Sequence, residues 1–135
     1  MREAFKNAYY VLEHDATQHL VWLRRTRASF EVLADVTRNH EELRHALAQL
    51  TADKLLLDLR EGPPGRNDAA FENAVAATRK ELEHRYRRVA VLVKTAAGRL
   101  QMQRLGREDG LAIPVFFDES EALRFLAEGR AAPAK

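Results

Sequence analysis

KLLLDL at residues 54–59 and RVAVLV at residues 88–93 are the stretches that decide the fold of this 135-residue chain. Each run is too short for a stable helix, and neither alternates polar with apolar residues. Short, nearly continuous apolar runs are typical of strands that are buried on both faces, as in parallel sheets covered by helices. The two runs therefore predict an α/β fold.

Amphipathic helices are predicted around these two strands. Asn39 and Glu42 have the spacing of a capping box at the start of a helix that continues through Leu50. Asn67 or Asp68 is expected to cap a second helix. Its apolar face is predicted to carry Phe71, Val75, Thr78, Leu82 and Tyr86, and its opposite face Glu72, Arg79, Lys80, Glu83 and Arg87. A third helix is predicted over residues 96–105, ending near Gly106.

The two ends of the chain complete the predicted fold. Aromatic and β-branched runs at residues 9–12 and 20–23 indicate a β-hairpin. The segment 30–36 fits neither period cleanly, and we favour a helix there. Residues 113–117 predict a last strand, after which Asp118 and Glu121 have the capping-box spacing of a closing helix.

The predicted order of elements is therefore ββαβαβαβα. Strands that alternate with helices imply parallel crossover units, here preceded by an antiparallel hairpin. We expect a mixed, mostly parallel sheet of about five strands with four helices, because such units each add one strand. Residues 1–128 are predicted to form a single domain, and residues 129–135 a disordered tail.

This order, together with RVAVLV and the closing segment VFFDESEALRFL at residues 115–126, resembles the STAS/SpoIIAA-like superfamily. In the anti-anti-sigma branch of that family, a partner kinase phosphorylates a Ser or Thr at the start of the helix after the third strand. Residues 58–68 contain neither Ser nor Thr, and Thr78 lies well inside the predicted second helix. A second branch, related to CRAL-TRIO-like lipid carriers, resembles the closing segment better and implies an apolar ligand.

The loop at residues 60–68, REGPPGRND, is the candidate binding site. It follows a predicted parallel strand and precedes a helix, which is where such folds place their sites and where free N–H groups favour anions. The residues we expect to contact a partner are Arg60, Arg66, Asn67 and Asp68. The loop lacks the lysine and hydroxyl of a phosphate-binding P-loop, and a rigid turn without a binding role stays an alternative.

Several classes of function lack support in the sequence. The absence of cysteine excludes disulfides and thiolate chemistry, and the five histidines lack the spacing of metal ligands, so we expect no metal and no cofactor. Neither Ser29 nor Ser120 lies in a nucleophile motif, so no enzymatic activity is expected.

The 22 Lys and Arg are interleaved with 20 Asp and Glu, and we expect no nucleic-acid partner. No run is long and apolar enough for a signal peptide or membrane span, which favours a cytoplasmic location.

The leading hypothesis is a regulatory domain of bacterial-type signalling that binds another protein through the loop at residues 60–68. The alternative is a small carrier that encloses a lipid or another apolar ligand between the sheet and its helices. A dimer through the edge of the hairpin is left open, because Trp22 lies in that hairpin.

Overall fold

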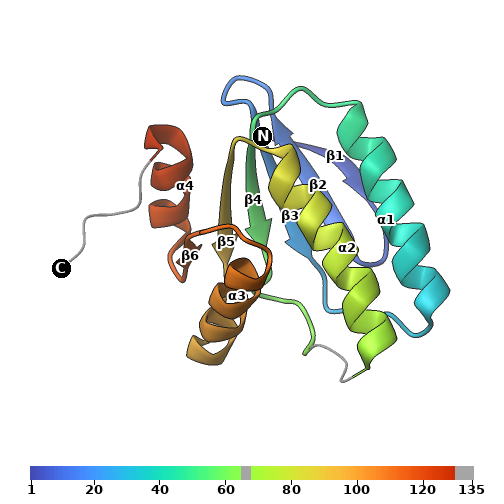
Figure 1. The fold of residues 1–135 in the computed structure, drawn as a ribbon. Helices are drawn as coiled ribbons and strands as arrows, with labels where there is room; N and C mark the ends of the chain where they lie inside the picture. Colours follow the sequence, from blue (N-terminus) through green and yellow to red (C-terminus); the bar gives the residue numbers. More distant parts are fainter. Residues whose placement is uncertain (65–67, 130–135) are drawn as a thin grey trace.

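The computed structural model describes residues 1–64 and 68–129 of the chain (Figure 1). These residues form an α/β fold with strands and helices in the order βββαβαβαβα. The described strands are β1 (Arg2–Lys6), β2 (Tyr10–Asp15), β3 (Leu20–Arg25), β4 (Lys54–Asp58), β5 (Arg88–Leu92) and β6 (Val115–Phe116). The described helices are α1 (Leu33–Ala48), α2 (Ala69–Arg85), α3 (Ala96–Glu108) and α4 (Glu119–Glu128).

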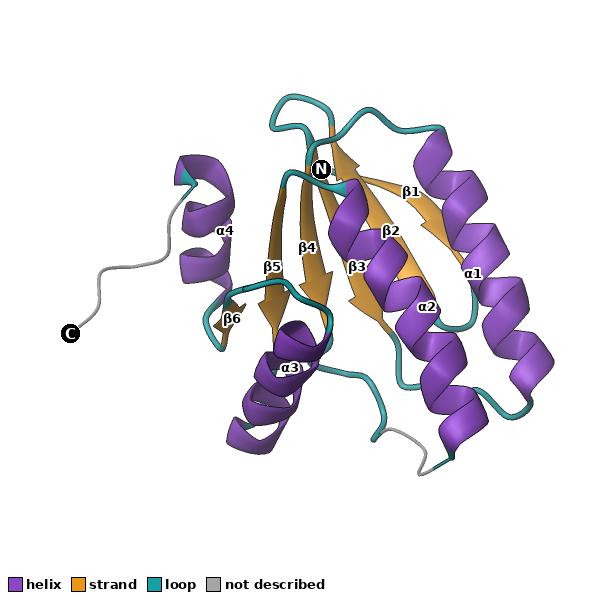
Figure 2. Ribbon diagram, viewed as in Figure 1, coloured by secondary structure: helices purple, strands orange, loops and turns teal. Residues whose placement is uncertain are grey.

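The strands form one mixed sheet in which the spatial order, β1-β2-β3-β4-β5-β6, is also the order along the chain. The pairs β1–β2 and β2–β3 are antiparallel, while β3 through β6 are parallel. The predicted hairpin and the mostly parallel sheet are thus confirmed. Helices α1, α2 and α3 lie on one face of the sheet, whereas α4 lies apart from them (Figure 2).

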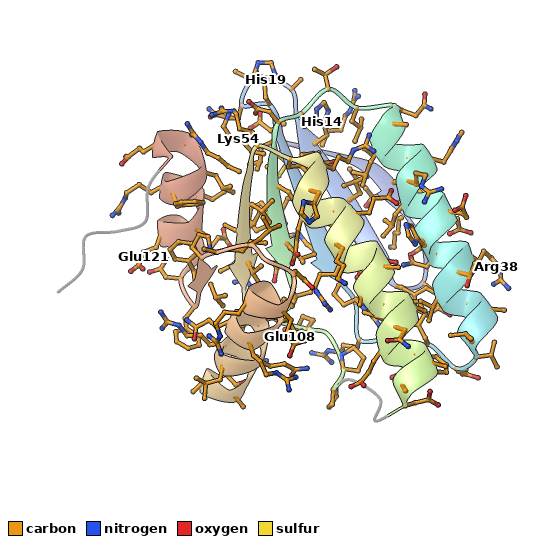
Figure 3. All side chains as sticks on the ribbon, viewed as in Figure 1. His14, His19, Arg38, Lys54, Glu108 and Glu121 are labelled. Carbon is orange, nitrogen blue, oxygen red and sulfur yellow. The ribbon has the colours of Figure 1, made fainter. Side chains whose placement is uncertain are left out.

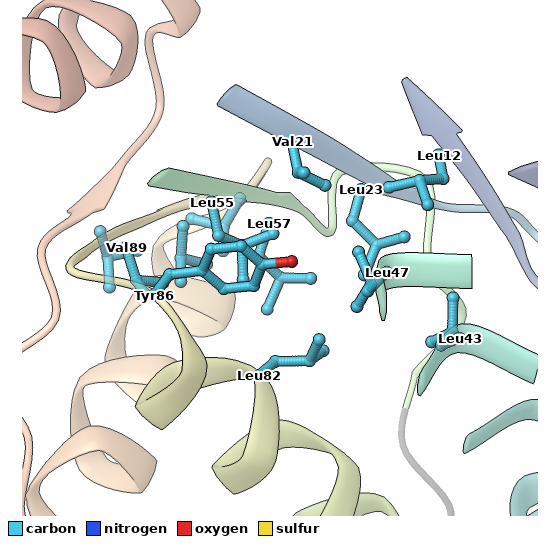
Figure 4. Close-up of a cluster of buried hydrophobic side chains, with 13 residues drawn as sticks. Leu12, Val21, Leu23, Leu43, Leu47, Leu55, Leu57, Leu82, Tyr86 and Val89 are labelled. Atoms are coloured by element: carbon cyan, nitrogen blue, oxygen red, sulfur yellow. The ribbon is translucent and has the colours of Figure 1, made fainter. Parts of the chain in front are cut away.

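The larger core lies between the sheet and the helices of the first face (Figure 4). Every second residue of the central strands points into it, including Leu55 and Leu57 of β4. Leu43 and Leu47 of α1 and Leu82 of α2 meet them from the helix side. All five side chains are at most 5% exposed, so burial of this layer supplies a large part of the folding free energy.

A smaller core lies on the opposite face of the sheet. Leu56 of β4 and Leu92 of β5 pack there against Ala122 and Leu126 of α4. Trp22 of β3 belongs to the same cluster and is 6% exposed. Because both faces of β4 are buried, the uninterrupted Leu55–Leu57 run is explained by its position in the centre of the sheet.

Side-chain caps fix where three of the helices begin. Asp68 accepts hydrogen bonds from the backbone N–H groups of Ala70 and Phe71 at the start of α2. Thr95 accepts one from Gly98 at the start of α3, and Asp118 caps α4 in the same way as Asp68 caps α2. The predicted caps at Asp68 and Asp118 are therefore confirmed.

The predicted start of the first helix at Asn39 is wrong. Helix α1 begins six residues earlier, at Leu33, where the carboxylate of Asp35 accepts a hydrogen bond from Val32 N at 3.4 Å. Asn39 lies inside the helix and is only 3% exposed, so its capping-box spacing with Glu42 has no capping role. The helix that we favoured for segment 30–36 is present only from Leu33 onward.

Other predicted boundaries are also corrected. Helix α3 continues past Gly106 to Glu108, and the left-handed residue that follows it is Gly110, with φ +77°. Strand β6 comprises only Val115 and Phe116. Strand β1 was not predicted, because its sequence, REAFK, is charged and exposed along a sheet edge. Residues 130–135 of the predicted tail lie outside the described residues.

Candidate ligand-binding site

A cavity of about 640 Å³ lies where the parallel strands β3, β4 and β5 end. Its floor is formed by the ends of these strands, and its walls by the first half of α1, by α2 and by α3. The loop after β4 contributes Gly62, Pro63 and Pro64 to its rim. In parallel α/β folds, ligands bind at this edge of the sheet.

The walls of the cavity are mainly apolar. Leu57 and Val93 extend from the ends of β4 and β5, Val36 faces them from α1, and Leu82 and Met102 from α2 and α3. The same three helices enclose the larger core, so the cavity continues that core toward the solvent. Such a lining favours an apolar molecule.

Two buried polar side chains also line the cavity. Thr78 of α2 is 7% exposed, and its hydroxyl oxygen has no hydrogen-bond partner in the described part of the chain. Asn39 of α1 is 3% exposed, and its carbonyl oxygen accepts a hydrogen bond from Asn7 Nδ2 at 2.9 Å. A buried hydroxyl without a partner costs free energy, so a ligand atom that bonds to Thr78 would be favoured.

Arg25, at the end of β3, is a half-buried cation of the cavity. Its Nη1 donates to the backbone carbonyls of Tyr9 at 3.3 Å and Thr26 at 3.0 Å. The guanidinium carbon lies 4.9 Å from the ring centre of Phe30 and 5.5 Å from that of Tyr10. Burial lowers the pKa of Arg25. No carboxylate of residues 1–64 or 68–129 forms an ion pair with it.

Gly62 allows the loop after β4 to approach Arg25 closely. A Cβ atom at Gly62 would lie 3.0 Å from Arg25 Cγ. A larger residue would therefore push the loop or the arginine stem aside. The loop thus covers the aliphatic part of Arg25 on one side of the cavity rim.

Arg60, one of the predicted partner-binding residues, is held within the protein. Its Nε and Nη2 donate to the two carboxylate oxygens of Asp58 at 2.9 and 2.7 Å, and Nη2 also reaches Glu119 at 3.2 Å. Burial raises the pKa of Asp58, but hydrogen bonds from Arg60 and Trp22 outweigh it and lower the pKa overall. Arg60 therefore joins β4 to α4, and a partner could bind its guanidinium fully only by opening this pair.

The other predicted partner-binding residues have separate outcomes. Asp68 uses its carboxylate as the cap of α2. Arg66 and Asn67 lie outside the described residues. Contact of all four residues with a partner stays a prediction. The described start of their loop borders the cavity, because Gly62, Pro63 and Pro64 line it.

The predicted exposed face of α2 is wrong at two positions. Arg79 is half-buried and Glu83 is buried, because α3 ends beside them: Arg79 Nε donates to Asp109 at 2.8 Å, and its distance to Glu83 is 3.9 Å. Burial raises the pKa of Glu83 to about 7, and the hydrogen bond and charge of Asp109 add to the rise. Arg79 lowers the pKa of Asp109 by hydrogen bonding to it. On the predicted apolar face, Val75 is the exception, at 40% exposed.

The described residues contain no cluster of three or more metal-ligating side chains. His14 and His19 lie near Lys54, where the parallel strands begin, at the end of the sheet away from the cavity (Figure 3). No helix in the described ranges has the length and apolarity needed to cross a bilayer.

The alternative of an apolar ligand between the sheet and its helices was raised from the sequence, but Arg25 was not predicted as part of the site. The position of the site at this edge of the sheet could be inferred, because the loop at residues 60–68 follows a parallel strand. Arg25, however, lies in a segment whose sequence is that of an ordinary basic connection. Its burial depends on Tyr9, Tyr10 and Phe30, which come together only through the hairpin and the segment before α1.

Comparison of this sequence with protein-family models and with curated proteins yields no match. What the chain binds must therefore be argued from the geometry and charge of the cavity.

Proposed function

We propose that this domain is a non-enzymatic binding module that holds a small apolar molecule in the cavity at the ends of β3, β4 and β5. The observation that carries the proposal is the cavity of about 640 Å³ with its mainly apolar walls. Ligand sites of roughly 300–1,000 Å³ accommodate small organic molecules, and most of them are apolar with a few polar groups. Thr78 and Arg25 are polar groups of this kind.

The arrangement of the helices supports this proposal. The cavity is bounded by residues of α1, α2 and α3, so a ligand would contact three helices and the ends of the strands at once. A molecule held in this way loses much of its apolar surface to the protein, which is the main source of affinity for such ligands. The resemblance of the closing segment to a branch related to CRAL-TRIO-like lipid carriers agrees with this proposal.

The experiment is a titration of the protein with Nile red, an uncharged apolar dye whose fluorescence rises in apolar surroundings. Val75 lines the cavity from α2 and is 40% exposed, so Val75→Trp should obstruct the opening without overfilling the core. We expect the variant to bind the dye at least about tenfold more weakly, a loss of roughly 1.4 kcal/mol.

The matched control is Ala77→Trp, because Ala77 is an exposed residue of the same helix that does not line the cavity. It should bind the dye like the parent protein. Equal loss of binding in both variants, or no saturable binding by the parent protein to Nile red or to a panel of apolar dyes, would contradict the proposal.

We also propose, as a second candidate, regulatory binding of another protein at the loop of residues 60–68. The observation that favours it is a pair of exposed cations beside this loop, Arg27 and Lys94, whose side chains are 86% and 68% exposed. Both lie close to the Glu61 carboxylate, at 3.0 and 3.7 Å, and both retain donors for an acidic partner.

Native mass spectrometry of protein isolated gently from its host tests this second candidate. A stoichiometric protein partner that is retained by the parent chain and lost in Arg66→Glu and Lys94→Glu variants would support it. The control is Arg38→Glu, because Arg38 is exposed on α1 and does not line the cavity. A partner that is retained in both the Arg66→Glu and the Lys94→Glu variant would place the interface elsewhere.

A further inference from the structure

We infer that the ligand of the cavity is an amphiphile with one carboxylate, and that Arg25 binds this carboxylate while the apolar body of the ligand lies against the helices. This inference rests on the proposed function. It adds the chemical class of the ligand and names the residue that selects it.

The balance of charge in the cavity is the first argument. Among the described residues, four cations line the cavity, Arg25, Arg60, Arg79 and Lys94, and no carboxylate does. Arg60 and Arg79 are neutralised by buried carboxylates behind the wall, Asp58 and Asp109. Lys94 is 68% exposed and lies 3.7 Å from Glu61. Of the four, only Arg25 is half-buried without a carboxylate partner among the described residues, and a cation in such surroundings is stabilised by an anion.

The geometry of the guanidinium is the second argument. Nη1 of Arg25 is occupied by the carbonyls of Tyr9 and Thr26, and these two hydrogen bonds fix the plane of the group. Neither Nε nor Nη2 forms a hydrogen bond to a described residue, so the edge between them keeps its two donors. Two parallel N–H donors on one edge match the two oxygens of a carboxylate.

Aromatic rings hold the guanidinium in this position. Tyr9 and Phe30 stack with ring centres 4.2 Å apart, and the Arg25 guanidinium lies 5.7 Å from the first ring and 4.9 Å from the second. Rings around a cation limit its access to water and strengthen its interaction with an anion. The free edge of Arg25 can donate to two oxygens of either a carboxylate or a phosphate. It satisfies both oxygens of a carboxylate but leaves the further oxygens of a phosphate without a donor from Arg25, so we expect a carboxylate to be preferred.

Isothermal titration calorimetry on the full chain tests the inference with three probes that share one apolar chain: decanoate, decanol and decyl phosphate. We expect decanoate to bind at least about tenfold more tightly than decanol, since only the carboxylate forms charge-assisted hydrogen bonds. Decyl phosphate is expected to bind more weakly than decanoate.

The decisive variant is Arg25→Gln, and the control is Arg38→Gln. Arg38 is 64% exposed on α1, lies outside the cavity lining and carries the same charge. In Arg25→Gln, the preference for decanoate over decanol should disappear while decanol still binds. In Arg38→Gln, the preference should stay. Thermal unfolding of each variant shows whether it is folded, and Arg25→Lys, which keeps the charge without the fork, should recover only part of the preference.

The outcomes separate this inference from the proposed function. Equal binding of decanoate and decanol by the parent protein would overturn the inference and leave the proposed function standing. Tighter binding of decyl phosphate than of decanoate would also overturn it. Failure of all three probes to bind, together with the absence of Nile red binding, would overturn the proposed function itself.

Discussion

Four polar side chains are buried among the described residues, Asn39, Asp58, Thr78 and Glu83, and each of them has a different role. Asn39 joins α1 to the turn after β1 through Asn7, and Asp58 joins β4 to Trp22 and Arg60. Thr78 lines the cavity, and no described residue forms a hydrogen bond with its hydroxyl oxygen. Glu83 is the residue whose protonation depends on pH near neutrality, because burial and the neighbouring carboxyl group of Asp109 raise its pKa to about 7.

Glu83 should make the stability of the protein fall as the pH rises. Its pKa is about 7 in the folded protein against an ordinary value of 4.5, so the folded state retains a proton that the unfolded state has lost between these two values. The stabilisation is complete below about pH 4.5 and is lost as the pH rises to about 7. The Glu83→Gln substitution removes this pH-dependent loss of stability, and the amide of the glutamine can still donate a hydrogen bond to Asp109.

Urea unfolding of the parent protein and of Glu83→Gln at pH 5 and pH 8 measures the effect. The variant should gain on the order of 2 kcal/mol relative to the parent between the two pH values, since a pKa change of one corresponds to roughly 1.4 kcal/mol. The exposed Glu72 of the same helix provides the control, and Glu72→Gln should differ from the parent by less than about 0.5 kcal/mol at either pH. A Glu83→Gln difference that does not change with pH would show that Glu83 is ionised in the folded protein throughout.

At the scale of the elements, the end of α4 illustrates how a strand stabilises a helix. Arg88, the first residue of β5, donates from Nη1 to the carbonyl oxygens of Leu126 at 2.7 Å and Ala127 at 3.2 Å. Gly129 ends the helix in the left-handed conformation, with φ +80°, and its N–H donates to Phe125 O. The last carbonyl groups of α4 are therefore bonded from two sides.

Gly129→Ala should destabilise the protein more than Gly110→Ala does. Both glycines have positive φ, which costs an alanine about 1–2 kcal/mol. A Cβ atom at Gly129 would also lie 2.8 Å from Arg88 Cζ, whereas nothing lies within 4 Å of one at Gly110. Chemical denaturation of both variants measures the difference, and combining Gly129→Ala with Arg88→Ala should reduce it. Equal losses in the two glycine variants would show that the contact with Arg88 is unimportant.

The elements differ in how well their sequences predict them. The Leu55–Leu57 run and the caps Asp68 and Asp118 carry strong local signals, and the structure agrees with each. Strand β1 has no such signal, because its side chains are charged and only Phe5 packs on the core. The half-buried position of Arg79 and the buried position of Glu83 depend on where α3 ends, so they could not be inferred from the periodicity of α2 alone. For the same reason the candidate site was predicted at its loop but not at Arg25.

At the scale of the whole molecule, one sheet separates two cores of unequal size. Strands β4 and β5 contribute residues to both cores, so the loss of either core removes packing that holds the same two strands. Trp22, the only tryptophan of the chain, lies in the smaller core, and its indole donates to Asp58 at 3.2 Å. The stability of the two cores should therefore be coupled.

Unfolding in urea should proceed in one step. We expect the fluorescence of Trp22, which reports on the smaller core, to change at the same urea concentration as the far-ultraviolet circular dichroism, to which α1, α2 and α3 contribute most. A fluorescence transition that comes first by more than about 0.5 M urea would show that the smaller core opens independently.

The order of the strands in the sheet, which repeats their order in the chain, also bears on how the protein is made. Synthesis on the ribosome proceeds from the N-terminus. Each strand from β2 to β6 therefore leaves the ribosome directly after one of the strands with which it pairs. No described strand has to wait for a later segment to be inserted beside it. The sheet can therefore grow outward from β1 in the direction of translation, and α4 covers its second face last.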